Sequence, residues 1–219
     1  FRNVPRHRML GKRKLLRAEP MLRERGLVGG ARYFDAQLDD ARLTLATIRS
    51  AERHGAALAS HVGVSGLEMA GGRVSGAYVA AGDGPAVLVR ATVVVNATGP
   101  WADRIRSMED PAARPLLRLT KGTHAMVRRD RIGHTAAITL TSAIDGRVMF
   151  VLPWGELSYI GTTDTDTDEP PESVRATPED VRYLLRSANA MFPNAHLTPD
   201  DVIATWSGLR PLLADPGAE

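Results

Sequence analysis

The sequence predicts an α/β fold in which helices and strands are mixed (α+β), and three observations support this. Residues 39–55 and 177–192 carry apolar side chains at helical spacing behind a residue suited to capping. Short apolar runs between them are separated by glycine turns, as in antiparallel hairpins. Three consecutive valines at 93–95 end in an Asn-Ala-Thr-Gly turn. Such a run is typical of a buried strand, whose end is often where a sheet meets a ligand.

The composition is that of a globular chain with one large domain or two small ones. The chain has 219 residues, of which 43% are hydrophobic. No apolar run approaches the ~20 residues that span a bilayer. The sequence has no cysteine, which excludes disulfides and thiolate metal sites, and we expect no metal centre. We expect a cytoplasmic protein, and the start at Phe1 suggests a fragment of a longer enzyme.

Positive charge is concentrated near the N-terminus. The net charge is only +3, but the isoelectric point is about 9.6. The basic residues of this cluster are Arg2, Arg6, Arg8, Lys12, Arg13, Lys14, Arg17, Arg23 and Arg25. Nucleic-acid binding also needs stacking aromatics or a recognised motif, and aromatic residues are only 5% of the chain. The cluster therefore favours a solvated surface that faces an anion or a membrane, with no nucleic-acid partner.

The N-terminal part predicts a basic segment, a strand and a well-marked helix. Residues 4–22 are expected to form short helical pieces broken by prolines and a glycine, and residues 31–37 a strand. Asp39 or Asp40 caps the helix that follows. Gly55 stands where a glycine commonly ends a helix.

A small antiparallel meander is expected next, followed by the valine strand. Glycine turns at 71–72 and 82–84 separate its short strands. After the valine strand, Pro100 suits the first turn of a helix, and Asp103 lies near the positive end of that helix.

The second half predicts long strands and one capped helix. Residues 116–129 read as a strand, and residues 147–166 as a hairpin that turns near Gly155. Thr177 caps a helix with apolar residues at helical spacing. A second capped turn follows, and residues 202–213 return as a strand that runs into a glycine turn.

The Ala97-Thr98-Gly99 corner has the features of a nucleotide contact. A flavin nucleotide approaches backbone closely at the ends of strands, and small residues leave room for that approach. Gly99 supplies the turn, while Ala97 and Thr98 supply the close surface. The alternative is that Gly99 only starts the next helix.

Five motifs in order resemble one family of flavoproteins. The motifs "DDARL", "VVNATGPWAD", "KGTHAMV", "IGTTDTD" and "WSGLRPL" are similar to those of the FAD-dependent glycerol-3-phosphate dehydrogenases. The resemblance runs from about Ala31 to Leu213. It implies part of a Rossmann-like FAD-binding domain together with a substrate domain built on an antiparallel sheet.

The resemblance also implies a division of the chain. Residues 1–38 are expected to be the basic segment and the start of the substrate domain, residues 39–106 part of the FAD-binding domain, residues 107–203 the substrate domain, and residues 204–219 a return to the FAD-binding domain. One departure is clear, because no G-x-G-x-x-G loop for the FAD pyrophosphate is present. We therefore expect that the chain alone does not hold FAD tightly.

The family reaction is oxidation of the C2 hydroxyl of sn-glycerol 3-phosphate to dihydroxyacetone phosphate, with hydride transfer to FAD and electrons passed on to quinone. It needs a base for the hydroxyl proton and cations for the phosphate. By resemblance, Arg210 is expected to be catalytic and to bind substrate, since a guanidinium suits a phosphate or a developing ketone oxygen. His124 is the expected base, because the ordinary histidine pKa of about 6.5 suits proton transfer.

The remaining expected site residues are Lys121 and Asp164 for substrate, and Ala97, Thr98, Gly99 and Gly208 for FAD. Three of the expected site residues also have an ordinary structural explanation. Arg210 is then an ion-pair residue, His124 a packed residue, and Asp164 part of a solvated loop. One rival function is an FAD-dependent amine or 2-hydroxy-acid oxidase or dehydrogenase. Another is a non-catalytic basic module that binds anionic lipid or nucleic acid.

Overall fold

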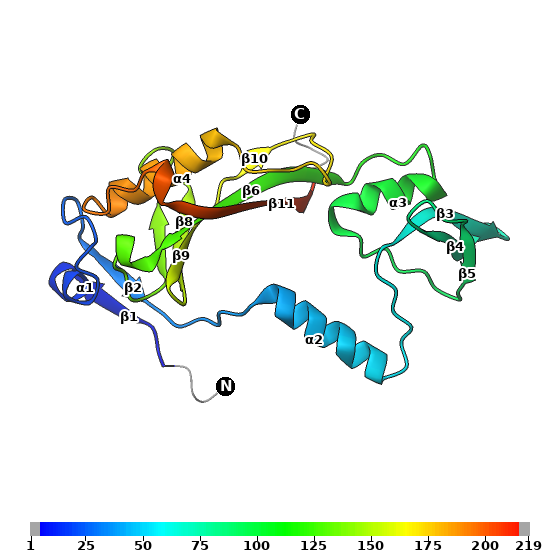
Figure 1. The fold of residues 1–219 in the computed structure, drawn as a ribbon, viewed down its shortest axis with the longest axis horizontal. Helices are drawn as coiled ribbons and strands as arrows, with labels where there is room; N and C mark the ends of the chain where they lie inside the picture. Colours follow the sequence, from blue (N-terminus) through cyan, green and yellow to red (C-terminus); the bar gives the residue numbers. More distant parts are fainter. Residues whose placement is uncertain (1–4, 215–219) are drawn as a thin grey trace. The chain divides into compact units, whose positions relative to one another are not determined.

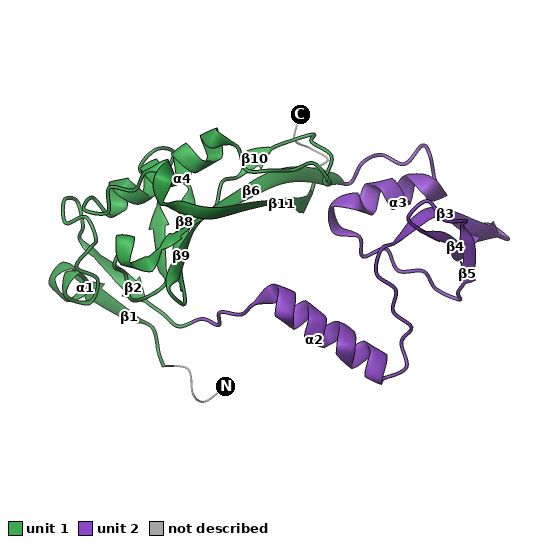
Figure 2. Cartoon of the chain, viewed as in Figure 1, with its two compact units in different colours: residues 1–34, 117–219 green, residues 35–116 purple. Residues whose placement is uncertain are grey.

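The computed structural model describes residues 5–214 and divides the chain into two compact units (Figure 2). Unit 1 comprises Phe1–Phe34 and Leu117–Glu219, and unit 2 comprises Asp35–Leu116. The expected mixture of helices with antiparallel sheets is confirmed in both units (Figure 1). Every helix among the described residues is too short or too polar to cross a bilayer.

Unit 1 is dominated by a six-stranded antiparallel sheet. The elements of this unit are β1 (Arg8–Gly11), α1 (Lys12–Ala18), β2 (Gly29–Arg32), β6 (Leu117–Arg128), η2 (Arg129–Arg131), β7 (Ile138–Thr141), β8 (Val148–Trp154), β9 (Leu157–Gly161), β10 (Thr165–Asp166), α4 (Pro178–Met191), η3 (Pro199–Asp201) and β11 (Val202–Leu213). The sheet order is β10-β6-β9-β8-β7, and β11 also pairs with β6. β10 and β9 pair with successive parts of β6, so this strand is the centre of the sheet.

Helix α4 covers one face of this sheet. It begins with a capping box, in which Thr177 and Asp180 exchange hydrogen bonds between side chain and backbone. Its apolar side chains recur at helical spacing and are buried against alternate residues of the strands. The buried core consists of Leu22, Ala125, Val127, Ile132, Leu140, Met149, Val151, Ile160, Leu184, Leu185, Ala188, Phe192, Ala195 and Leu197. The predicted cap, helix and hairpin turn at Gly155 are all confirmed.

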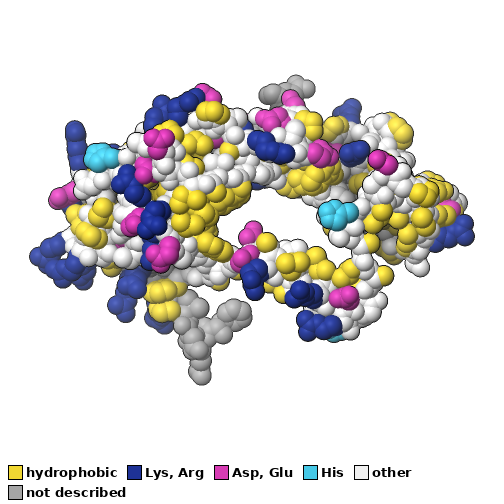
Figure 3. All heavy atoms as spheres, viewed as in Figure 1, with side chains coloured by type: hydrophobic (Ala, Val, Ile, Leu, Met, Phe, Trp, Pro, Cys, Tyr) yellow, Lys and Arg dark blue, Asp and Glu magenta, His cyan; other side chains and the backbone are white. Residues whose placement is uncertain are grey.

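Unit 2 contains a three-stranded meander and two helices. Its elements are α2 (Asp40–Arg53), β3 (Val62–Ala70), β4 (Arg73–Ala81), β5 (Val87–Arg90), η1 (Gly99–Trp101) and α3 (Ala102–Glu109). The predicted meander is confirmed, and Gly71 and Gly72 make its first turn with positive φ angles of 58° and 75°. Asp39 caps α2 as expected, by accepting a hydrogen bond from the Arg42 backbone at 3.0 Å. The apolar side chains of α2 remain exposed (Figure 3).

The predicted buried valine strand is wrong. Residues 91–98 are assigned to no strand, and Val93 and Val95 are 71% and 79% exposed. A strand exists through hydrogen bonds to a neighbour, and no described segment of the chain pairs with this run. The valine side chains favour burial, but they do not determine which strand would pair with this segment.

Two smaller expectations also need correction, and the domain division stays a prediction. The expected strand at 31–37 is the shorter β2, and residues 4–22 contain β1 as well as a helix. The strand at 202–213 does not turn at Gly208 but continues through it. β11 pairs with β6 along its length, so residues 204–214 lie in unit 1. The assignment of residues 204–219 to the FAD-binding domain stays a prediction. The remainder, 215–219, lies outside the described residues.

Candidate active site

Three of the expected site residues lie on the face of the six-stranded sheet opposite α4. Successive side chains of a strand point to opposite faces, so laterally paired residues share a face. The relevant pairs are Arg210 with Thr120, Gly208 with Gly122, Trp206 with His124, and His124 with Gly161. We call this surface the open face. The structure thus brings Arg210, His124 and Gly208 onto one surface.

Arg210 reaches across the central strand. Its Nη2 donates to Thr162 Oγ1 at 2.7 Å, and its Nη1 to Asp164 Oδ1 at 3.2 Å. Arg210 stands on β11, whereas Thr162 and Asp164 lie on the far side of β6, between β9 and β10. The guanidinium passes over Gly122, where an added Cβ would lie 2.3 Å from Nη2. A side chain at position 122 would therefore displace the guanidinium.

The segment that receives Arg210 is attached to β6 by its own hydrogen bonds. Thr163 N donates to the Thr123 carbonyl at 3.3 Å, and Thr123 N donates to Thr163 Oγ1 at 2.9 Å. Thr163 is 4% exposed and Thr123 is 0% exposed, so these bonds are shielded from water. The acceptors of Arg210 therefore belong to the framework of the sheet, although Asp164 itself is exposed.

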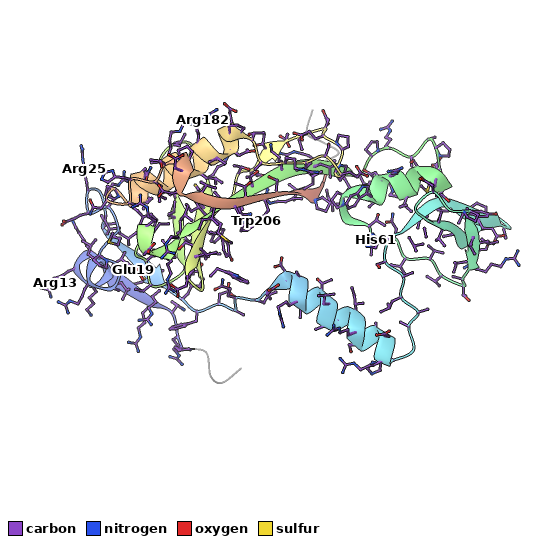
Figure 4. The ribbon with its side chains drawn as sticks, viewed as in Figure 1. Arg13, Glu19, Arg25, His61, Arg182 and Trp206 are labelled. Carbon is purple, nitrogen blue, oxygen red and sulfur yellow. The ribbon has the colours of Figure 1, made fainter. Side chains whose placement is uncertain are left out.

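His124 lies in an aromatic cluster on the same face. Its ring stacks on Trp206, with centroids 4.9 Å apart and planes 13° apart. Tyr159 meets the imidazole edge-on at 5.8 Å. The ring lies above Gly161, where an added Cβ would approach the imidazole Cδ2 to 2.1 Å. Trp206 projects from β11 on the side away from α4, and it is 41% exposed (Figure 4).

A cavity of about 300 Å³ opens beside the Arg210 guanidinium. Its lining residues are Arg147, Val148, Thr162, Asp164 and Arg210. Two guanidinium groups and one carboxylate give this small cavity a net positive lining, which suits a small anionic molecule. A larger hollow of about 440 Å³ lies at α4 and contains none of the predicted residues.

Lys121 does not lie with the other predicted substrate residues. It is 5% exposed on the face that α4 covers, and its Nζ is 3.0 Å from Asp180 Oδ2. Burial raises the pKa of Asp180, but hydrogen bonds from Thr177 and Lys121 outweigh it and hold that pKa below its usual range. Because neighbours along a strand point to opposite faces, Lys121 and Gly122 cannot both border the Arg210 site. The expectation that Lys121 contacts substrate is therefore corrected to an ion pair with α4.

The small-residue corner of unit 2 is a separate feature, described by itself. Asn96 Nδ2 donates to the Ala102 carbonyl at 2.9 Å, and Thr98 Oγ1 donates to Asn96 Oδ1 at 2.7 Å. Gly99 has a φ of +57°, and an added Cβ there would point into open space. The corner is thus an ordered, bare stretch of backbone. Its exposed surface is compatible with the close approach of a nucleotide.

This arrangement can be compared with known proteins. The family described as FAD dependent oxidoreductase matches residues 2–218. The chain belongs to the FAD dependent oxidoreductase family. It is 40% identical over 215 residues to an alpha-glycerophosphate oxidase of Streptococcus pyogenes, covering 95% of this chain and 35% of that protein. It is 39% identical over 214 residues to a glycerol-3-phosphate dehydrogenase of Mycobacterium leprae, covering 97% of this chain and 36% of the other.

Solved structures of two flavoprotein or oxidase relatives have a similar fold. The glycerol-3-phosphate dehydrogenase from Bacillus halodurans, complexed with FAD, superposes with a TM-score of 0.87 and 37% identity, covering 94% of this chain and 42% of that one. The glycine oxidase from Geobacillus kaustophilus gives a TM-score of 0.68 at 26% identity, covering 96% and 52%. The resemblance drawn from the five motifs is confirmed. The chain spans about a third of the length of the curated relatives it matches.

Sequence reasoning missed the residues that surround Arg210 and His124. Thr162, Gly122 and Gly161 all lie inside quoted motifs, and Trp206 begins "WSGLRPL". The motifs therefore contained these residues, but roles were assigned mainly to the charged residues within them. That a glycine leaves room for a side chain from another strand is visible only when the strands are paired.

Proposed function

We propose that the complete polypeptide carrying this chain oxidises the C2 hydroxyl of sn-glycerol 3-phosphate to dihydroxyacetone phosphate. The observation that carries this proposal is the hydrogen-bonded guanidinium of Arg210 on the open face, which also carries His124 and its aromatic cluster. The relatives named above as alpha-glycerophosphate oxidase and glycerol-3-phosphate dehydrogenase support the choice of substrate.

Each side chain has a stated part in this reaction. The Arg210 guanidinium binds the anionic substrate and stabilises charge that develops on the C2 oxygen. His124 accepts the proton of the C2 hydroxyl, since its ring is held in one plane by Trp206 and Tyr159. Asp164 orients Arg210 through the 3.2 Å hydrogen bond and also lines the substrate cavity.

The residues proposed to contact FAD are Ala97, Thr98, Gly99 and Gly208. None of them carries a large side chain, and an added Cβ at Gly99 or Gly208 would meet no atom within 4 Å. Each of these two positions, taken by itself, is compatible with a flat ring system resting against backbone. When bound, FAD accepts the hydride that leaves C2.

Purification of the complete enzyme tests this function. We expect a yellow protein that turns over sn-glycerol 3-phosphate but neither sarcosine nor 2-hydroxyglutarate. Arg210→Met is expected to lower kcat/KM by about 100-fold or more, because a group that stabilises developing charge is lost. A colourless protein that does not bind added FAD, or a preference for sarcosine, contradicts the proposal.

We further propose that the enzyme attaches peripherally to the cytoplasmic face of the membrane and passes its electrons to quinone. Arg13, Lys14 and Arg17 are exposed on α1, and basic side chains gather over this end of unit 1 (Figure 3). Clustered basic side chains attract anionic lipid at short range. We expect the enzyme to sediment with phosphatidylserine vesicles in a salt-sensitive manner, and the triple variant Arg13→Glu/Lys14→Glu/Arg17→Glu to lose this binding. In a separate assay, we expect faster turnover with quinone than with oxygen as the electron acceptor. Vesicle binding that is insensitive to salt and to these substitutions contradicts the membrane proposal. Turnover with oxygen but not with quinone contradicts the proposed electron acceptor.

A further inference from the structure

Arg147, immediately before β8, is a second arginine of the cavity beside Arg210. It lies outside the motifs that resemble the family, so neither charge nor spacing drew attention to it. Its Nη1 donates to the main-chain carbonyl of Asp164. Its Nε lies 3.2 Å from Asp145 Oδ2. Arg147 thus joins the turn between β7 and β8 to the segment between β9 and β10.

The same residue, Asp164, is held from two sides by two arginines. Arg147 binds its main-chain oxygen, and Arg210 binds its carboxylate at 3.2 Å. Asp164 is exposed and lies at the end of a segment whose buried hydrogen bonds are made by Thr163. The residue after Asp164 begins β10, which pairs with β6. The bond from Arg147 is therefore a further contact on the Asp164 backbone, at the point where the carboxylate meets Arg210.

Arg147 is itself anchored on the side away from Asp164. Asp145, its ion-pair partner, accepts hydrogen bonds from the Tyr183 hydroxyl at 2.9 and 3.0 Å. Tyr183 belongs to α4 and packs against the hydrophobic core. A guanidinium that donates to acceptors in two different directions has fewer accessible orientations, which favours a defined position for Arg147.

We propose that Arg147 is a positioning residue for Arg210, acting through Asp164. This inference rests on the proposed function for its kinetic part only. Arg147 fixes the Asp164 backbone, the Asp164 carboxylate and Thr162 fix the Arg210 guanidinium, and the guanidinium then meets the substrate anion in one orientation. Arg147 does not touch the reacting atoms.

The first test is kinetic and uses the complete enzyme. Arg147→Met is expected to lower kcat/KM for sn-glycerol 3-phosphate by about tenfold, with the same division between kcat and KM as Arg210→Met. Arg147→Lys keeps a donor near the Asp164 carbonyl and should restore most of the activity. In an Arg210→Met background, Arg147→Met should have no further effect, because the side chain that Arg147 is proposed to position is absent. Multiplying losses in the double variant would mean that Arg147 acts on the substrate directly and would overturn the proposal.

Arg118 provides the matched control. It is an exposed arginine that binds Asp166, two residues after Asp164, at 2.7 Å. Arg118→Met removes an ion pair from the same edge of the sheet but leaves both bonds to Asp164 in place. We expect it to retain wild-type kcat/KM, whereas an equal loss in both variants would mean general loosening of this edge and would count against a positioning role.

The second test does not depend on turnover. A crystal structure of Arg147→Met should show Arg210 Nη2 moved out of hydrogen-bond distance of Thr162 Oγ1, with the bond intact in Arg118→Met. If Arg210 keeps its wild-type hydrogen bond to Thr162 in Arg147→Met, the proposal is wrong regardless of the kinetic results. If the wild-type enzyme fails to oxidise sn-glycerol 3-phosphate, the proposed function fails, and the crystal structures still decide the role of Arg147.

Discussion

The two faces of the six-stranded sheet differ in what fills them. On the face covered by α4, Lys121, Ala125 and Ile160 are at most 5% exposed, and the Lys121 ammonium is paired with Asp180. The open face carries Arg210 and the aromatic cluster around His124. Alternation along the same strands thus yields a packed side and a side with accessible polar groups.

Two glycines make room for side chains on the open face. Gly122 and Gly161 each lie under a side chain from a neighbouring strand, Arg210 and His124 respectively, that we propose to be catalytic. On the covered face the same strands carry side chains that fill the core. Stability is therefore expected to depend mainly on the covered face, and activity on the open face, and four substitutions test this division.

The largest expected effect is a loss of stability when the buried ion pair between Lys121 and Asp180 is broken. Asp180→Asn leaves the Lys121 ammonium buried without its counter-ion, which typically costs about 4 kcal/mol of unfolding free energy. The folded-state pKa of Asp180 is lowered, so its stabilisation is present above the ordinary aspartate pKa of about 4 and is lost as the pH falls through the lower folded value. Thermal unfolding should show a large Tm difference at pH 7 that narrows below about pH 4. A difference independent of pH would contradict the ion-pair interpretation.

Truncation in the core of the covered face comes next. Leu184 is 0% exposed on α4, so Leu184→Ala should cost about 3 kcal/mol by removing buried apolar contacts and leaving a cavity. Chemical denaturation of the complete enzyme measures it, with exposed Arg186→Ala on the same helix as the control. Activity per folded molecule should be unchanged, and a large loss of it would break the proposed division between the faces.

An added methyl group on the open face should lower activity but not stability, the opposite of the core truncation. Gly122→Ala places a Cβ 2.3 Å from the Arg210 guanidinium, and displacement of such a group by about 1 Å typically costs ~100-fold in rate. We expect kcat/KM to fall by that order while Tm changes little. Gly63→Ala on β3, where the Cβ meets no atom within 4 Å, should leave both unchanged. Equal kinetics for the two alanine variants would remove the argument for Gly122.

The smallest effect is expected at Trp206. Trp206→Ala removes the ring stacked on His124, a contact worth about 1 kcal/mol, or roughly fivefold in kcat/KM. Because Trp206 is 41% exposed, its loss should hardly change Tm. Trp206→Phe keeps a stacking partner and should recover most of the activity. Failure of phenylalanine to do so would mean that stacking is not what Trp206 contributes.

Much of the fold was predictable because its signals are local. The caps at Asp39 and Thr177 and the turn at Gly155 depend on residues close in sequence, and all are confirmed. The valine run was misassigned because a strand also needs a partner, which no residue at 93–95 can specify. Gly208 was misread as a turn for the same reason, since its place within β11 depends on pairing with β6.

By itself, the sequence determined the local elements, the family and the identity of Arg210 and His124 as candidates. Only the tertiary structure decided that Lys121 and Arg210 lie on opposite faces, since α4 is more than 50 residues from Lys121 in the chain and covers one face of β6. The same holds for Gly122 beneath Arg210 and for Arg147 behind Asp164. Local propensity acts over a few residues, whereas strand pairing and helix packing set which distant side chains meet.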